Sequence, residues 1–249
     1  MAINVNTVYQ TVLMILNKEQ RGYMTPTEFN TVATQVQLEI FEKYFDDLNQ
    51  QLRIPQADTD YADRQENIDE KLAIFKTFGE AIYTTTAGLS YFVLPTSDTY
   101  GNVVSFYRLG NVLYNDEKVV QRLDRHEFYY ANQSRLTKPS TINPAYLYEN
   151  QKLFVKPTSI TDKIKVDYVR KPSDVVWGFT PGNVGQYVWN NTPYSLSNPT
   201  GSTNFEIHQS EQTEVILKIL LYSGIIIRDP EVVQTAAALV QADETNKKS

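Results

Sequence analysis

The chain has 249 residues, of which 41% are hydrophobic and 21% are charged, so it is long enough to bury one large core or two smaller ones. It contains no cysteine and only two histidines, His126 and His208, which excludes disulfides, thiolate metal sites and cysteine nucleophiles and argues against a histidine-rich metal centre. The formal net charge of −6 argues against a protein that grips DNA or a membrane surface through clustered Lys and Arg.

The first predicted elements are two amphipathic helices. Residues 4–20 place their apolar side chains on one helical stripe, and Gly22 breaks the pattern. The sequence Thr25-Pro26-Thr27-Glu28 then has the residues of a capping box, with proline at the first helical position. The long apolar stripe that follows predicts a helix that runs to about Arg53, where Pro55 stops it.

A loop and a shorter helix complete the predicted N-terminal segment, residues 1–80. Residues 57–65 are polar and acidic, and we expect them to form a loop. Apolar side chains at helical spacing then predict a third helix that ends near Gly79. These side chains are Ile68, Leu72, Ile74, Phe75 and Phe78.

Residues 81–180 have a different character and predict a β-rich module, either a small barrel or a sandwich. Turn signals recur at short intervals and include Ala87-Gly88, Asn115-Asp116 and Glu149-Asn150. Residues 163–169 are the clearest strand because apolar and polar residues alternate there. The side chains predicted to face the core from this strand are Ile164, Val166 and Tyr168. Residues 123–133 predict a short helix that interrupts the strands.

Residues 181–204 are uncharged and rich in Asn, Gly, Pro, Ser, Thr and aromatic residues. We interpret them as an arm that folds against a partner, because it brings no charges that would have to be desolvated. We expect this arm to be disordered until it binds. The aromatic residues predicted to make inter-subunit contacts are Tyr187, Trp189 and Tyr194. Trp177, which follows the predicted strands directly, is instead expected in the core.

The final segment, residues 205–249, predicts a return to helix. One helix is expected from Phe205 until Asp229-Pro230 breaks it, and an Ala-rich helix is expected over residues 231–244. Helices at both ends of the chain most simply pack together. The predicted fold is therefore α+β: a helical bundle formed by the N- and C-terminal helices, with an inserted β-rich module, a barrel or a sandwich.

Familiar catalytic motifs are missing from the sequence. It has no Gly-rich phosphate loop, no nucleophile elbow and no HExxH. Asp46 and Asp47 are interpreted as a solvated helix face rather than a metal site, and the charges around His126 as surface ion pairs rather than a general base. We therefore predict no enzyme activity, no catalytic residues, no bound metal and no cofactor, and we retain a hydrolase based on Asp46, Asp47 or His126 as an alternative.

Several stretches of the chain carry a resemblance to a known group of proteins. They are residues 135–140 (RLTKPS), 143–146 (NPAY), 153–157 (LFVKP), 166–172 (VDYVRKP), 177–178 (WG) and 205–211 (FEIHQSE). Together they resemble virion proteins of short-tailed phages, most strongly those of crAss-like phages, from Ile82 to the end of the chain. The layout of the N-terminal helices is similar to that of tail adaptor subunits, which are also called tail tubular protein A-like.

This resemblance implies a subunit of a ring, usually twelvefold, in the head-to-tail connector below the portal. The implied partners are copies of the chain itself, the portal protein and neighbouring tail and ring proteins. The ring would form part of the DNA channel and enclose the genome without sequence-specific binding. The implied location is the neck or tail of the virion, after assembly in the cytoplasm of the bacterial host, with no membrane partner. The family transfers no catalytic residues to this chain.

Two further functions stay open at this point. One is a capsid-stabilising or other tail-associated protein of the same particle, which copy number and location would distinguish. The other is a glycan- or receptor-binding module, which the 17 tyrosines and the β-rich middle would suit.

Overall fold

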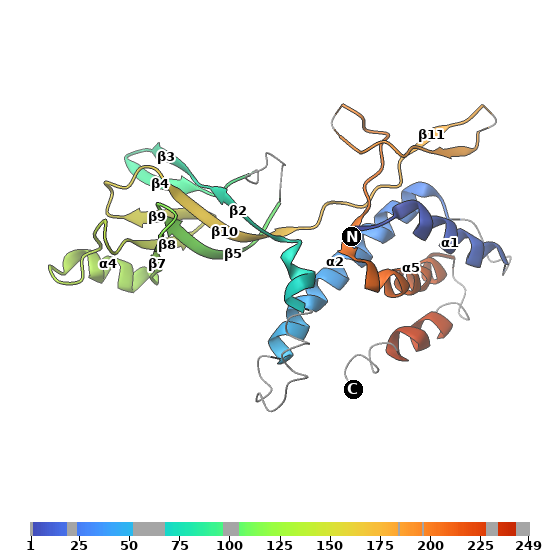
Figure 1. Ribbon diagram of the computed structural model, residues 1–249, viewed down its shortest axis with the longest axis horizontal. Helices are drawn as coiled ribbons and strands as arrows, with labels where there is room; N and C mark the ends of the chain where they lie inside the picture. Colours follow the sequence, from blue (N-terminus) through green and yellow to red (C-terminus); the bar gives the residue numbers. More distant parts are fainter. Residues whose placement is uncertain are drawn as a thin grey trace. The chain divides into compact units, whose positions relative to one another are not determined.

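The computed structural model describes residues 2–18, 24–51, 68–96, 105–183, 185–195, 197–227 and 234–242. Helices and strands are both well represented, so the fold is mixed α+β, as expected at that level. The chain divides into two compact units (Figure 1). Unit 1 contains Met1–Leu72 and Pro172–Ser249, and unit 2 contains Ala73–Lys171.

Two sheets make up the described part of unit 2. The first has the strand order β2 (Lys76–Glu80), β10 (Ile164–Lys171), β5 (Ser105–Tyr114) and β6 (Lys118–Val119), and all its pairs are antiparallel. The second has the order β3 (Ile82–Thr86), β4 (Leu89–Val93), β9 (Lys152–Lys156), β8 (Ala145–Glu149) and β7 (Gln121–Arg122). Its pairs are antiparallel except β7 with β8, which is parallel.

The two sheets share one hydrophobic core. The predicted inward face of β10 is confirmed, since Ile164, Val166 and Tyr168 are all buried. They join Phe92 of β4 and Leu153 of β9 in a single cluster of buried side chains. Because residues from both sheets enter this cluster, unit 2 has a core of its own.

Local turn chemistry fixes the strand pairs of the second sheet. Ala87 and Gly88 have φ of 52° and 79° and connect β3 to β4. Asn150 and Gln151 have φ of 50° and 58° and connect β8 to β9 in the same way. Two consecutive residues at positive φ match the twist of a tight hairpin. The turn predicted at Ala87-Gly88 is therefore confirmed, and the turn predicted at Glu149-Asn150 lies one residue later.

Two helical predictions in and near unit 2 have different outcomes. The predicted short helix is confirmed as α4 (Arg125–Gln133). The predicted third helix is wrong beyond residue 73, because residues 68–73 are helical but residues 74–75 form a turn and β2 begins at Lys76. β2 forms an antiparallel pair with β10, for example Phe78 with Asp167. This tertiary pairing overrides the local helical spacing.

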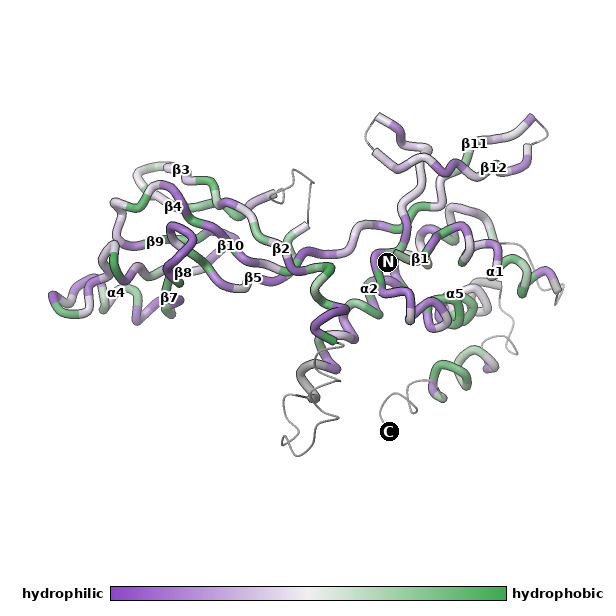
Figure 2. Tube along the Cα trace, in the orientation of Figure 1, coloured by the Kyte–Doolittle hydropathy of each residue, from purple (hydrophilic) through white to green (hydrophobic). Residues whose placement is uncertain are grey.

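Unit 1 is built around three helices. They are α1 (Val5–Lys18), α2 (Pro26–Gln51) and α5 (Gln212–Ile227), and α5 is the most continuously hydrophobic of them (Figure 2). The predicted capping box of α2 is confirmed, since the Thr25 backbone N–H donates to Glu28 Oε2 at 2.9 Å and the Glu28 N–H donates to Thr25 Oγ1 at 3.4 Å. Residues 234–242 are also helical, within the range predicted for the last helix.

The predicted helix at residue 205 begins later than expected. Phe205–His208 form strand β13, which pairs with β1 (Ala2–Ile3), and the short 3-10 turn η1 (Gln209–Glu211) leads into α5. Phe205 and Ile207 are buried and alternate with the half-buried Glu206 and His208, so this stretch has a strand period rather than a helical one. The predicted loop at 57–65 and the helix stops at Gly22 and Pro55 lie outside the described residues.

A polar stripe on α2 holds the chain that leaves unit 2. Asn30 accepts from the Trp177 N–H at 2.7 Å, and Thr34 Oγ1 accepts from the Val175 N–H at 3.1 Å. Gln37 donates to the Ser173 carbonyl at 2.7 Å. Side chains three and four residues apart share one helix face. This face of α2 therefore forms hydrogen bonds with the backbone of residues 173–177, as a neighbouring strand would do in a sheet.

The arm continues from this anchored segment as a hairpin and a loop. β11 (Phe179–Pro181) pairs antiparallel with β12 (Tyr187–Trp189). The loop that follows closes on itself through the Ser202 N–H, which donates to the Thr192 carbonyl at 2.7 Å. Gly178 is required at the base of the arm, because a Cβ there would lie 2.2 Å from the Thr200 carbonyl oxygen. The described residues of the arm therefore form a hydrogen-bonded structure, and the disorder expected before binding stays a prediction.

Candidate functional site

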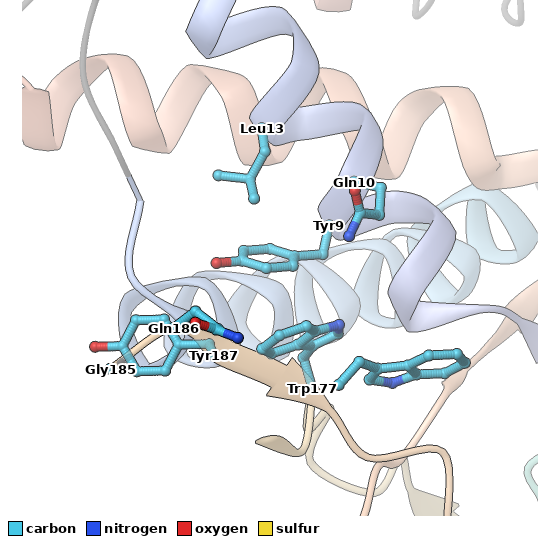
Figure 3. Close-up of a pocket in the computed structure, with 8 residues that line it drawn as sticks. Tyr9, Gln10, Leu13, Trp177, Gly185, Gln186 and Tyr187 are labelled. Atoms are coloured by element: carbon cyan, nitrogen blue, oxygen red, sulfur yellow. The ribbon is translucent and has the colours of Figure 1, made fainter. Parts of the chain in front are cut away.

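An aromatic groove lies between α1 and the hairpin of the arm (Figure 3). Its volume is about 330 Å³, at the lower end of the range for ligand sites. The residues that line it are Tyr9, Gln10, Leu13, Trp177, Gly185, Gln186, Tyr187 and Trp189. All of them belong to unit 1. This groove is the candidate functional site.

The floor of the aromatic groove is formed by two buried, hydrogen-bonded aromatic residues. Trp177 is 3% exposed, which confirms its predicted place in the core. Its indole N–H donates to Asn6 Oδ1 at 3.0 Å, and its ring lies 4.5 Å from that of Tyr9. Tyr9 is fixed in turn, because its hydroxyl donates to the Met24 carbonyl at 3.1 Å. Both aromatic rings thus have their polar atoms satisfied within the fold.

The wall of the aromatic groove is formed by the hairpin and is more accessible. Tyr187 is 43% exposed and packs edge-on against Phe179 at 4.9 Å. The Trp189 indole N–H donates to Ser202 Oγ at 3.1 Å, which joins the hairpin to the loop. Gln10 and Gln186 are exposed and supply amide donors and acceptors at the rim.

The site is also free of formal charge. The sequence from Val175 to Phe205 contains no Asp, Glu, Lys, Arg or His, and α1 contributes Tyr9, Gln10 and Leu13. An uncharged surface with aromatic anchors can be buried against a partner without the desolvation of ions. The aromatic groove therefore suits contact with a protein partner or with an uncharged ligand.

The structure brings together two of the three predicted contact residues. Tyr187 and Trp189 both lie on β12 and line the aromatic groove. Tyr194 is exposed in the loop, where its N–H donates to the Ser202 carbonyl at 3.1 Å, and it is not among the residues that line the groove. The contribution of α1 was missed, because nothing in a helical stripe indicates which distant strand it will face.

A network of two buried carboxylates and their half-buried partners, which the sequence did not reveal, connects the helices of unit 1. Lys43 on α2 contacts Glu214 on α5 at 3.1 Å, and Lys71 contacts Glu211 at 2.5 Å. Lys218 contacts Glu214 at 3.8 Å and Glu39 at 3.7 Å. The i,i+4 spacing of Glu214 and Lys218 was the available local signal. Each carboxylate in this set has a lysine partner, which is the arrangement that buried ions require.

Two tyrosines border this charge network. Burial, together with the nearby Glu211 and Glu214, raises the pKa of Tyr44 well above its usual range. The hydroxyl of Tyr222 donates to Glu39 Oε1, and this hydrogen bond and partial burial raise the pKa of Tyr222 to about 12. Both phenols therefore stay protonated at neutral pH. The arrangement fits a structural connection between helices better than a general base.

The residues of the alternative enzyme hypothesis are separated by the fold. Asp46 is exposed and Asp47 half-buried on α2 in unit 1, whereas His126 is exposed on α4 in unit 2. His208 caps η1 by accepting from the Ser210 N–H at 3.3 Å. Among the described residues, no group of three or more His, Asp and Glu side chains is arranged to hold a metal ion.

A second cavity, of about 390 Å³, lies within unit 2. Its lining comes from the β3–β4 turn, α4 and strands β8 and β9, and includes Leu89, Phe128 and Phe154. Arg125 and Glu149 form an ion pair at 3.7 Å in this lining. Both residues are substantially exposed, so this pair adds little stability.

Comparisons of this chain with known proteins found no match. No protein-family model matches the chain, and no curated protein sequence matches it. Within the described ranges, no helix combines the length and the apolar character needed to cross a membrane. Functional interpretation therefore depends on the geometry of the site and on the sequence resemblance.

Proposed function

We propose that this chain is a non-enzymatic structural protein of a tailed-phage particle, a subunit of a twelvefold ring in the head-to-tail connector below the portal. In this proposal α1, α2 and α5 form the helical bundle of an adaptor subunit, and unit 2 is its inserted β-rich module. The resemblance of the stretches at 135–172 and 205–211 to virion proteins of crAss-like phages supports this assignment.

The observation that carries the proposal is the uncharged, structured arm with its aromatic groove. A ring requires a heterologous interface, in which two different surfaces of the same subunit meet. Tyr187 and Trp189 are the residue types that dominate the binding energy of protein interfaces. Since the arm is held to α2 at Trp177 and Val175, its aromatic residues are presented from a fixed base.

The net charge fits a channel that encloses DNA without gripping it. Each copy carries a formal charge of −6, and phosphate contacts made by Lys and Arg are what give DNA-binding proteins their affinity. An acidic ring would let the duplex slide, because carboxylates in the lumen repel phosphates within roughly 8 Å at physiological salt.

Quantitative mass spectrometry of purified particles from the source virus tests this proposal. The expected result is about one copy of this chain per portal subunit, or a small multiple. Hundreds of copies per particle would instead favour the capsid-stabilising alternative. Complete absence from the particle would refute the virion assignment and return the enzyme hypothesis to consideration.

A glycan- or receptor-binding module is the second candidate, and one observation favours it. The aromatic groove combines the exposed ring of Tyr187 with the amides of Gln10 and Gln186 and contains no charge, which suits the apolar faces and hydroxyl groups of a sugar. Glycan-array binding by the purified protein, lost in Trp189→Ala, would support this function. Binding that Trp189→Ala does not change would argue against the groove as the sugar site.

A further inference from the structure

One segment of unit 2 presents four strongly exposed hydrophobic side chains. Tyr129 and Tyr130 on α4 are 55% and 71% exposed, and in the loop after α4 Leu136 is 97% and Ile142 69% exposed. We call residues 129–142 the tip; it extends beyond the strands of its own unit (Figure 1). A leucine with almost its whole side chain in water has no role in the core of the described fold, whereas clustered exposed apolar residues mark interaction sites.

Hydrogen bonds within the tip define its conformation. The Ser134 N–H donates to the Tyr130 carbonyl at 3.2 Å, and Ser134 Oγ accepts from the N–H groups of Leu136 and Thr137, both at 3.3 Å. Further along, Ser140 and Asn143 exchange two hydrogen bonds of 3.2 Å. A surface that is already ordered loses little conformational entropy when it binds.

The tip also differs in charge from the rest of the molecule. From Phe128 to Tyr148 the charged residues are Arg135 and Lys138, and there is no Asp or Glu. This stretch therefore carries +2, while the whole chain carries −6, so the remainder carries −6 − 2 = −8. A positive apolar surface on an acidic protein is complementary in charge to other copies of that same protein.

We propose that the tip is a docking surface for a second copy of this chain. Leu136 and its apolar neighbours are buried in the contact, and Arg135 and Lys138 face carboxylates of the second copy. The contact is heterologous, because a basic tip meets an acidic surface and not another tip. Repeated from copy to copy, such a contact produces a closed ring or an open chain. This inference rests on the proposed assembly of copies and adds the surface that brings them together.

The apolar part of the proposal is tested by sedimentation velocity over a range of protein concentrations. Leu136→Asp is expected to weaken self-association at least tenfold, because it places a charge where a leucine is buried. Ile82→Asp is the matched control, since Ile82 is 63% exposed on β3 of the same unit. Circular dichroism confirms that both variants fold. Equal self-association of wild type and Leu136→Asp, or a monomeric wild type, overturns the proposal.

The charge complementarity in this proposal predicts that self-association depends on the salt concentration. Wild-type self-association is expected to weaken several-fold between about 0.05 and 0.5 M NaCl, because screening shortens the range of charge attraction. Arg135→Glu/Lys138→Glu is expected to associate more weakly at low salt and to lose this dependence. If the double variant keeps the wild-type salt dependence, the basic residues do not face carboxylates and the charge argument fails.

Site-specific cross-linking identifies the surface that the tip contacts. The chain has no cysteine, so Leu136→Cys carries a single site for a benzophenone maleimide. Irradiation of the purified protein is expected to give covalent dimers and higher species, whose cross-linked peptides lie outside the tip and near acidic residues. The same label at Ile82→Cys is the control. Cross-links from tip to tip would overturn the heterologous contact.

These experiments separate the inference from the proposed function. They use purified protein, whereas the proposed function is tested on virus particles. Tip-dependent self-association of a protein that is absent from the particle would refute the phage assignment and leave the docking surface established. A protein present at ring stoichiometry whose copies do not associate through the tip would refute this inference alone.

Discussion

The amide of Gln37 joins three segments that are far apart in the sequence. The side chain is 1% exposed; its Nε2 donates to the Ser173 carbonyl at 2.7 Å, and its Oε1 accepts from the Glu206 N–H at 2.9 Å. We predict that Gln37→Met lowers the free energy of unfolding by about 2 to 4 kcal/mol, because each backbone group left without a partner costs about 1–3 kcal/mol.

Tryptophan fluorescence during denaturant unfolding measures this effect selectively. Both tryptophans, Trp177 and Trp189, lie in unit 1, so the signal reports the unit that contains Gln37. Gln35→Met is the control on the same helix, because Gln35 is exposed and substitutions at such positions change stability by about 0.5 kcal/mol or less. Equal effects of the two substitutions would show that the buried amide has no special role.

Two tyrosines beside the charge network are expected to respond in opposite directions to the loss of a hydroxyl. The buried Tyr44 hydroxyl has no hydrogen-bond partner among the described residues, so Tyr44→Phe should raise the free energy of unfolding by about 1 kcal/mol. Tyr222 donates to Glu39, so Tyr222→Phe should lower it by about 1 kcal/mol. Denaturant unfolding followed by tryptophan fluorescence measures both, and a loss of stability in Tyr44→Phe would indicate a partner for its hydroxyl.

The raised pKa of Tyr222 predicts a loss of stability in alkali. The hydrogen bond to Glu39 raises this pKa to about 12 from its ordinary value of 10, so the folded state binds the proton more tightly than the unfolded state. The contribution to stability is complete below pH 10 and is lost as the pH rises from about 10 to 12. Tyr222→Phe should flatten the pH dependence of unit 1 unfolding in this window, and identical slopes in both proteins would contradict this origin.

At the scale of elements, the sequence correctly predicted the helices and the strand face that depend on interactions within a single segment. The helices α1, α2 and α4 and the inward face of β10 follow from periodicity and capping within single segments. β2 and β13 could not be predicted in this way. β2 becomes a strand because it pairs with the distant β10, against its local helical spacing. β13 alternates over only four residues before the chain turns into α5, and it pairs with the distant β1.

Some residues of the candidate site could likewise be predicted from the sequence, and others could not. Tyr187 and Trp189 could be selected from the sequence, because they are aromatic residues in an uncharged segment. Gln10 and Leu13 could not, because only the fold brings α1 against the hairpin. The charge network was also hidden, since the partner of Lys71 is Glu211, on a segment far along the chain.

The hydrogen bonds of Ser202 allow a test of whether the arm is ordered in the free protein. Ser202 Oγ accepts from the Gly178 N–H at 3.0 Å and from the Trp189 indole at 3.1 Å, and it donates to the Asn190 carbonyl at 2.6 Å. Ser202→Ala removes all three bonds. We expect at least tenfold faster amide exchange within residues 178–203, because one lost hydrogen bond of about 1.5 kcal/mol already corresponds to that factor.

Hydrogen exchange followed by mass spectrometry measures this change in the free protein. Ser197→Ala is the control, because Ser197 is an exposed residue of the same arm whose hydroxyl contacts only Ser195 Oγ among the described residues. Slow exchange of the wild-type arm would establish that it is ordered before it binds a partner. Complete exchange of the wild-type arm within seconds would instead support the expected disorder before binding.

At the scale of the whole molecule, strand pairing explains how one unit can interrupt the other. Unit 2 enters the chain after Leu72 and leaves it before Pro172. Its first strand, β2, pairs antiparallel with its last, β10, so that Lys76 lies opposite Val169. Residues paired across an antiparallel ladder are about 5 Å apart at Cα. The two connections to unit 1 therefore leave unit 2 side by side, as insertion of one unit into another requires.

This geometry predicts that unit 2 folds on its own. Every member of its core cluster lies between Ala81 and Tyr168, and the length of Ala73–Lys171 is typical of an independent domain. Residues 73–171, expressed alone, should give a strand-rich circular dichroism spectrum and one cooperative thermal transition. The shorter fragment 81–163 is the control; it lacks β2 and β10 and with them Ile164, Val166 and Tyr168, so it should not fold. A longer fragment without a cooperative transition would mean that unit 2 depends on unit 1 for its stability, and that the chain folds as one body despite its two cores.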